Sequence, residues 1–162
     1  MAQLVHNDAI DCGGQIMDGQ MRLRAATGDD LPAMQALLAA ESLPVGGVAE
    51  GIRHFHVFED GQSIIATAGI EPLGSSALLR SLVVVSAWRG RGLARQLTER
   101  MVQYARELGI ESLYLLTMDA DGFFAGLGFR RVSRDEAPEK IQACRQYREQ
   151  CPDSAVLMRK AV

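Results

Sequence analysis

The sequence contains few cysteines and no long apolar run, and each shortage excludes a class of protein. Its three cysteines, Cys12, Cys144 and Cys151, are an odd number without a CxxC pair, so neither a disulfide framework nor a structural zinc site is indicated. No segment reaches the length of a membrane span, and the N-terminal MAQLVHNDAI lacks the pattern of a signal peptide. These shortages favour a cytoplasmic protein that has no membrane partner.

An excess of positive charge is also missing. The chain has 17 Lys and Arg against 20 Asp and Glu, a net charge of -3. This balance argues against a nucleic-acid partner, because a protein that grips a phosphate backbone needs a basic face. The hydrophobic content of 48% and the charged content of 23% are those of an ordinary globular protein. A small acidic or amino substrate remains open.

The chain of 162 residues fits one domain. Residues 1–20 are polar, glycine-rich and aperiodic, so we expect an N-terminal tail followed by a domain over residues 21–162. Apolar spacing and turn signals predict alternating strands and helices in that domain. Strands are expected at residues 21–25, 77–85, 111–117, 128–132 and 155–160, a hairpin at 54–72 joined at Asp60-Gly61, and helices at 31–41, 93–108, 119–127 and 139–150. This order predicts an α/β fold with a sheet of mixed direction.

The stretch VVVSAWRGRGLARQL lies between an apolar strand and an amphipathic helix. The first N–H groups of such a helix have no partner inside the helix, and they attract anions. Gly90 and Gly92 leave room for a phosphate to approach the main chain, while Arg89 and Arg91 add charge without forming the primary cradle. The alternative is a surface turn with solvated arginines.

The same stretch matches the pattern [Q/R]xxGx[G/A] through Arg89, Gly92 and Ala94, and it resembles the acetyl-CoA signature of the GNAT superfamily of N-acetyltransferases. The strand LLRSLVVV before it, the strand ESLYLLT and the stretch FFAGLGFRRV follow that superfamily's order. The resemblance covers residues 21–162. Within the superfamily, GIEPLGSSALLRSLVV, FFAGLGFRRV and CPDSAVLMRK are similar to the arsenic-resistance N-acetyltransferases, which implies a role in detoxification.

The resemblance implies a GNAT fold, with a mixed, mostly antiparallel central sheet of roughly six to seven strands flanked by helices and splayed at the acetyl-CoA site. It also implies residues that bind acetyl-CoA, the co-substrate. Leu82, Val83 and Val84 would line the acetyl group and the pantetheine arm, and Thr117 and Phe124 would border the arm on its other side. The pyrophosphate would lie against Arg89, Gly90, Arg91, Gly92, Leu93 and Ala94.

Acyl transfer to an amine needs a base that frees the amine and a proton for the departing thiolate. The family often supplies that proton from a tyrosine in an FYxxxGF-like stretch, where this chain has Phe124. Tyr147 or a water would then substitute. For the base we expect Glu71, although a solvated glutamate at a strand end is an equal alternative.

The predicted substrate-binding residues are Arg80, Ser81 and Arg145. An arginine within the apolar strand LLRSL is costly to bury unless it meets an anion, which either Glu71 or a substrate carboxylate would supply. Arg145, with Lys140 and Arg148, would read an acidic substrate, or would belong to a solvated helix face.

No metal site is predicted. His54 and His56 share one face of an expected strand but have no third ligand at a readable spacing. Cys144 and Cys151 would lie about 10 Å apart on a continuous helix, too far for both thiols to hold one arsenic atom.

The sequence therefore predicts a transferase, an acyltransferase that moves acetyl from acetyl-CoA to a primary amine of a small molecule. A homodimer is compatible with this prediction. An amino acid or a toxic glutamate-like analogue is the expected acceptor. The alternative is a catalytically silent acetyl-CoA-binding sensor or scaffold. The phenylalanine at position 124, where the family often has a tyrosine, favours this alternative.

Overall fold

A computed structural model describes residues 21–61 and 63–162, so the expected tail over residues 1–20 lies outside the described residues. The described part forms a seven-stranded sheet in the order β1-β2-β3-β4-β5-β7-β6. The strands are β1 (Met21–Ala25), β2 (Phe55–Asp60), β3 (Ser63–Leu73), β4 (Ser76–Val84), β5 (Ser112–Thr117), β6 (Arg130–Arg131) and β7 (Val156–Ala161). Neighbouring strands are antiparallel except for β4 and β5, which are parallel. The predicted mixed, mostly antiparallel sheet is thereby confirmed.

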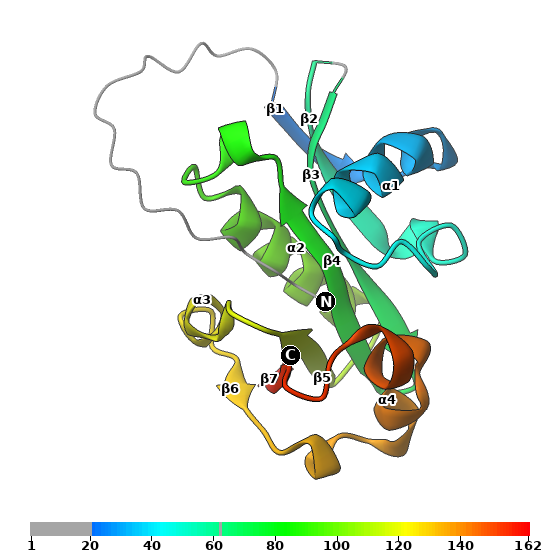
Figure 1. The fold of residues 1–162 in the computed structure, drawn as a ribbon, viewed down its shortest axis with the longest axis vertical. Helices are drawn as coiled ribbons and strands as arrows, with labels where there is room; N and C mark the ends of the chain where they lie inside the picture. The colour runs from blue at the N-terminus through cyan, green and yellow to red at the C-terminus, as the bar shows by residue number, and fades with distance from the viewer. Residues whose placement is uncertain (1–20, 62) are drawn as a thin grey trace.

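Helices cover both faces of this sheet (Figure 1). They are α1 (Leu31–Ala40), α2 (Leu93–Glu107), α3 (Asp121–Ala125) and α4 (Glu139–Ala143). The apolar stripe of α2, including Leu97 and Met101, packs on one face together with Phe124 and Phe129. On the other face, Met34 and Leu38 of α1 share a core with Ile141 of α4. Because β4 lies between these two cores, every one of its residues is buried, as its apolar sequence predicts.

The strands β4 and β5 diverge along their length. Their parallel register covers only Ser76 to Leu78 opposite Ser112 to Tyr114, and Figure 1 shows the two strands spreading apart beyond this point. β4 also carries an irregularity, because its register against β3 shifts between Thr67 and Gly69. There Ser81 has a φ of 57°, the left-handed conformation that a bulge residue often adopts. Both features change the direction of β4 backbone groups near the middle of the sheet.

The segment after β6 differs from the sequence prediction. Instead of one helix over residues 139–150, α4 ends at Ala143, Cys144 is extended, and a π-helical turn covers Gln146–Gln150. Backbone N–H groups of Tyr147 and Gln146 contact the Cys144 thiol, and burial raises the pKa of that thiol. The expected spacing of Cys144 and Cys151 on a continuous helix is therefore wrong; both are free, buried cysteines in the same core.

Two smaller expectations also need correction. His54 does not share a strand with His56, because a 3-10 turn, Ile52–His54, precedes β2. The strand expected over residues 128–132 contains only Arg130 and Arg131. Short elements of this kind depend on their neighbours more than on their own sequence pattern.

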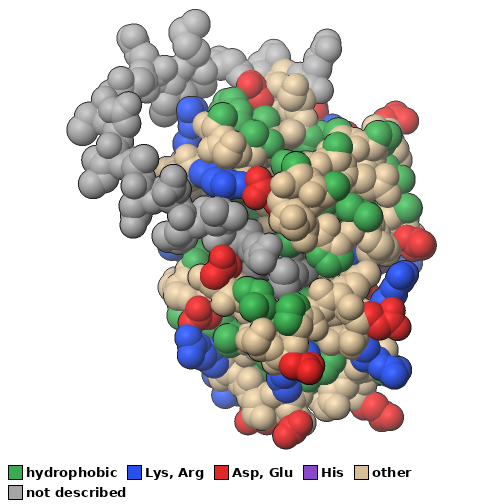
Figure 2. All heavy atoms as spheres, viewed as in Figure 1, with side chains coloured by type: hydrophobic (Ala, Val, Ile, Leu, Met, Phe, Trp, Pro, Cys, Tyr) green, Lys and Arg blue, Asp and Glu red, His purple; other side chains and the backbone are tan. Residues whose placement is uncertain are grey.

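Basic and acidic side chains are interspersed on the face seen in Figure 2 and form no large patch of one sign. Within residues 21–61 and 63–162, no helix has both the length and the apolar character needed to cross a membrane. The same residues contain no group of three or more His, Cys, Asp or Glu side chains arranged to hold a metal ion.

Candidate active site

The glycine turn forms the start of α2. After β4, a 3-10 turn (Ser86–Trp88) leads to Arg89 in an extended conformation. Gly90 and Gly92 then have φ values of 74° and 80°, in the left-handed region that residues with a Cβ atom rarely adopt. A Cβ atom built on Gly90 would meet no atom within 4 Å, and one on Gly92 would meet only Gln96, at 3.9 Å. The glycines are therefore needed for the backbone path, and the space above them is open.

Backbone N–H groups at this turn have no hydrogen-bond acceptor within residues 21–61 and 63–162. The first hydrogen bond into the helix is donated by Gln96 N–H to the Gly92 carbonyl, at 3.1 Å. Among the described residues, no acceptor contacts the N–H groups from Gly90 to Arg95. Several unpaired N–H groups at the positive end of a fifteen-residue helix form a seat for an anion.

The two arginines of the turn are already engaged by protein groups. Arg89 donates from Nε to the Val84 carbonyl at 3.0 Å and forms an ion pair with Glu41 at 2.6 Å. The guanidinium of Arg91 lies over the Trp88 ring, 4.6 Å from its centroid. An anion at this turn would therefore be held mainly by backbone N–H groups, and its binding there stays a prediction.

The residues expected along the pantetheine arm lie where β4 and β5 diverge. Leu82, Val83 and Val84 are buried at the end of β4. Thr117 ends β5, and its hydroxyl accepts a hydrogen bond from the Ala120 N–H at 3.1 Å. Phe124 is 0% exposed and packs edge-on against Phe123 and Phe129, so its ring belongs to the core beside α2. Their contact with a coenzyme stays a prediction.

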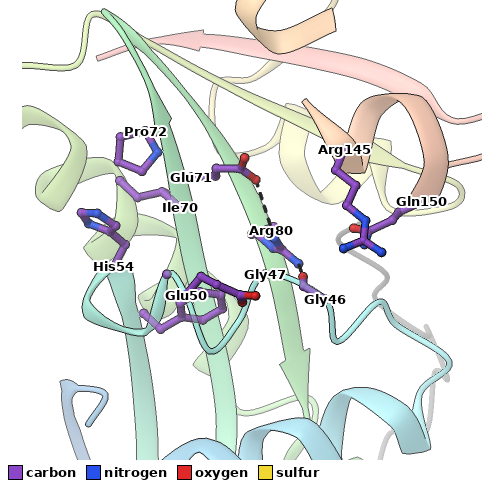
Figure 3. A pocket seen from close by; sticks show the side chains of 12 residues that line it. Gly46, Gly47, Glu50, His54, Ile70, Glu71, Pro72, Arg80, Arg145 and Gln150 are labelled. Atoms are coloured by element: carbon purple, nitrogen blue, oxygen red, sulfur yellow. Dashed lines mark hydrogen bonds and ion pairs between the residues drawn. The ribbon is translucent and has the colours of Figure 1, made fainter. Parts of the chain in front are cut away.

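A cavity of about 260 Å³ lies on the α1 side of β3 and β4. Figure 3 shows side chains from several segments converging on it. Its lining combines the loop after α1, a 3-10 turn with the start of β2, the end of β3, the middle of β4 and the segment after α4 that includes the π-helical turn. The lining residues are Gly46, Gly47, Glu50, Gly51, His54, Phe55, Ile70, Glu71, Pro72, Arg80, Arg145 and Gln150.

Arg80 lies at the centre of this cavity and is only 4% exposed. Its guanidinium donates to the Gly46 carbonyl at 2.5 Å and to the Ser81 hydroxyl at 3.3 Å. Burial lowers the pKa of Arg80 from its usual value, and the nearby Glu71 carboxylate opposes that change. A Cβ on Gly47 would lie 2.8 Å from Arg80 Nη1, so this glycine allows the loop to approach the guanidinium closely.

The charge of Arg80 is incompletely compensated. Its carboxylate partner is Glu71, at 3.6 Å, and the Glu71 side chain is 35% exposed. This distance is longer than a charge-assisted hydrogen bond. A buried guanidinium with a distant counter-ion beside a cavity favours the binding of a further anion.

The structure therefore brings Arg80, Glu71 and Arg145 to one cavity. Ser81 does not line the cavity but contacts Arg80 through its hydroxyl. Arg145 is the most exposed of them: its side chain is 72% exposed and contacts Glu149 at 3.3 Å. Arg145 thus lies at the rim of the cavity.

Tyr147 lies apart from this group. Its hydroxyl donates to the Arg134 carbonyl at 2.9 Å, and the Arg134 guanidinium covers its ring at 4.6 Å. It is absent from the cavity lining. The sequence predicts Tyr147 as a proton donor, and this geometry gives that role no support.

Sequence reasoning missed Glu50, Gln150 and the loop glycines, and it considered His54 only as a possible metal ligand that lacks enough partners. His54 lines the cavity, with its Nδ1 3.0 Å from the Tyr104 hydroxyl and its Nε2 accepting from Arg53 Nε at 3.0 Å. Burial lowers the pKa of His54, and Arg53 lowers it further. The pair Gly46-Gly47 was the available signal, because adjacent glycines often mark a close backbone approach.

Comparison with known proteins identifies the family. The acetyltransferase (GNAT) family profile matches residues 25–129, which is more than half of the chain. The chain belongs to this family of acetyl-CoA-dependent acetyltransferases. The predicted superfamily and its fold are thereby confirmed.

Individual relatives point in the same direction. The chain is 32% identical over 98 residues to an uncharacterized N-acetyltransferase of Chlorobaculum tepidum, covering 60% of this chain and 63% of the relative. It is 32% identical over 138 residues to an amino-acid acetyltransferase of Pseudomonas syringae pv. tomato, covering 84% of this chain and 29% of the relative. The chain thus spans less than two thirds of either curated relative.

Solved structures share the fold. A Mycobacterium tuberculosis protein in complex with CoA and a second bound molecule has a TM-score of 0.75 at 19% identity, covering 87% of this chain and 99% of that one. An N-acetylglutamate synthase of Neisseria gonorrhoeae, complexed with coenzyme A and N-acetyl-glutamate, has a TM-score of 0.76 at 21% identity, covering 89% of this chain and 35% of that one.

Proposed function

We propose that residues 21–162 form an N-acetyltransferase domain that transfers acetyl from acetyl-CoA to the primary amine of an amino acid. The observation that carries this proposal is the position of the buried Arg80, which links the divergent strand β4 to a cavity of about 260 Å³. A cytoplasmic location and a homodimer stay predictions from the sequence.

The coenzyme seat fits the chemistry of a diphosphate. Unpaired N–H groups after Gly90 and the αL glycines provide main-chain donors with open space in front of them. Acetyl-CoA would bring the acetyl group as a thioester, whose carbonyl carbon the acceptor amine attacks. The edge of β4 beyond Leu78 has no pairing with β5, so its backbone groups remain to orient the pantetheine arm and the carbonyl.

The acceptor would enter the cavity with its carboxylate on Arg80. A guanidinium binds a carboxylate through two parallel N–H donors, and Arg80 uses part of its donors on Gly46 and Ser81. Arg145 at the rim would add attraction for an acidic side chain. Anchoring the carboxylate at Arg80 would place the amine beside β4, where the acetyl group is expected.

Glu71 is the proposed proton acceptor, directly or through a water. It lines the same cavity and lies 3.6 Å from Arg80, so one guanidinium would orient both the substrate carboxylate and the base. The proton for the thiolate would come from water, because a thiol of pKa about 8.5 leaves without an obligatory acid.

The relatives named amino-acid acetyltransferases support an amino acid as the acceptor. The arsenic-resistance subtype and a role in detoxification are finer proposals, which rest on the stretches that resemble that family. They predict that toxic glutamate-like analogues are accepted along with natural amino acids.

A substrate panel tests the proposal. Purified protein with acetyl-CoA is offered amino acids, glutamate-like herbicides, their arsenic analogues, polyamines and peptides, and the products are read by mass. Release of CoA that rises with an amino acid supports the proposal. Binding of acetyl-CoA without amine-dependent CoA release would instead identify a silent sensor or scaffold, and acetylated peptides alone would identify a protein-modifying enzyme.

A further inference from the structure

Glu41 occupies an unfavourable position unless it has a cationic partner. It is the C-cap residue directly after α1, and the carbonyl end of a helix carries partial negative charge that repels a carboxylate. The last turn of α1 contains no basic residue. The compensation comes from Arg89, which lies 48 positions further along the chain and contacts Glu41 at 2.6 Å.

This ion pair is shielded from solvent. The side chains of Arg89 and Glu41 are 25% and 23% exposed, so the pair is screened less than a fully exposed one. Arg89 also donates from Nε to the Val84 carbonyl at 3.0 Å. The segment Arg89 to Gly92 before α2 is called the coenzyme turn below. The Arg89 guanidinium therefore connects this turn to the end of β4 and to the end of α1.

The chain segment that begins at Glu41 also builds the acceptor cavity. Gly46, Gly47 and Glu50 of this segment line the cavity, and the Gly46 carbonyl accepts from Arg80. The segment is thus held at two places: at Glu41 by the coenzyme turn, and at Gly46 by the proposed substrate arginine. Only four residues separate Glu41 from Gly46, so a change in the turn would reach the cavity wall through a short stretch of chain.

We propose that Glu41 is a positioning residue that acts through Arg89 to fix the acceptor loop, residues 41–51, to the coenzyme turn. A coenzyme that orders the turn then strengthens binding of the amino acid. In this arrangement Arg89 holds the two segments together through Val84 and Glu41, and the backbone N–H groups of the turn bind the diphosphate. The inference rests on the proposed function, because it assumes the coenzyme seat and the acceptor cavity described above.

Calorimetry of the whole chain tests the inference without turnover. The dissociation constant of CoA is measured, and then that of the best-acetylated amino acid, or of L-glutamate if none is acetylated, with and without saturating CoA. The variants are Glu41→Gln, Arg89→Gln and the double variant. Glu99→Gln is the matched control, because Glu99 pairs with Arg95 at 3.7 Å on the exposed surface of α2.

We expect Glu41→Gln to weaken amino-acid binding in the presence of CoA by about three- to tenfold, and to change the affinity for CoA by less than about twofold. Arg89→Gln should weaken amino-acid binding to the same extent, with a loss of CoA affinity that stays below about tenfold, and the double variant should bind the amino acid no worse than either single variant. Glu99→Gln should match the wild type. Glu41→Asp, which keeps the charge, should recover part of the coupling.

The opposite pattern would overturn the inference. If Arg89→Gln weakens CoA binding more than about tenfold while Glu41→Gln tightens it, Arg89 is a phosphate ligand that competes for two anions. The coupling would also be excluded if the wild-type protein binds the amino acid equally well with and without saturating CoA. These outcomes are separate from failure of the proposed function, which shows as absent amino-acid binding or as absent acetylation of any amine.

Discussion

The coenzyme turn and the acceptor cavity are built from different materials. The turn is one continuous segment in which two αL glycines and a helix N-terminus present backbone N–H groups. The cavity combines residues from a loop, three strands and a π-helical turn, with the buried Arg80 at its centre. Under the proposed function, the backbone donors of the turn would bind the diphosphate, a group that stays the same whatever the acceptor. A cavity made of side chains is free to change its substrate.

The largest expected effect concerns the turn. Gly92→Asp places a carboxylate where the diphosphate is proposed to lie, and like charges in contact cost several kcal/mol. We expect coenzyme affinity to fall by at least about 100-fold, measured by calorimetry with CoA.

Gly109→Asp is the matched control for this substitution. Gly109 has a φ of 73°, ends the same helix at its other terminus, and has no atom within 4 Å of a built Cβ. It therefore carries the same backbone strain far from the turn, and its CoA affinity should stay near that of the wild type. Equal losses in both variants would show that strain, and not a diphosphate at Gly92, explains the effect.

The same contrast explains what the sequence could predict. The turn was recognisable because a tight path over Gly90 and Gly92 demands glycines at fixed spacing, and α2 because its apolar stripe has helical period. The cavity depends on how far Gly46 approaches Arg80 across the sheet, and no local pattern encodes that distance. The apolar spacing also gives no sign of the break at Cys144, where the backbone becomes extended and the thiol contacts the following N–H groups.

Arg80→Met should affect the cavity and leave the turn unchanged. Methionine keeps much of the volume but removes the charge, and loss of one partner of a buried charged contact costs about 2–5 kcal/mol. We expect kcat/KM for the amino acid to fall by roughly 30-fold or more, with CoA affinity changed less than about threefold. Arg145→Gln, at the exposed rim, should cost less than about threefold. If Arg145→Gln has the larger effect, the substrate carboxylate lies at the rim instead.

A third prediction concerns the pH dependence of the stability of the fold that both regions share. His56 on β2 is 5% exposed, with Tyr104, Arg100 and Glu107 of α2 around it. Burial, aided by Arg100 and opposed by Glu107, lowers its pKa from 6.5 to about 4. Between these values the unfolded chain binds a proton that the folded chain does not, so the free energy of unfolding falls as pH decreases through this window.

The expected loss between pH 7 and pH 4 is roughly 1–3 kcal/mol, measured by urea unfolding. Asp30, whose pKa is lowered to about 2 mainly by the hydrogen bond to Arg24, loses its stabilising effect only at lower pH. His56→Gln should flatten the curve above pH 4. If the variant keeps the full slope, another group causes it, and a decline in activity over this range could not be assigned to His56.

The smallest effect is expected for Tyr147→Phe. This substitution tests whether Tyr147 supplies the proton to the departing thiolate, the role that the sequence predicts. The hydroxyl of Tyr147 is held by the Arg134 carbonyl at 2.9 Å, and its ring packs under the Arg134 guanidinium. Removing this hydroxyl deletes one hydrogen bond, worth about 0.5–1.5 kcal/mol of stability, and leaves the ring in place. We expect kcat to change by less than about threefold at all pH values, because loss of a true general acid costs ~10²–10⁴ in rate. A hundredfold loss of kcat that narrows at low pH would instead make Tyr147 the proton donor, and would require the π-helical turn to move toward β4 when the coenzyme binds.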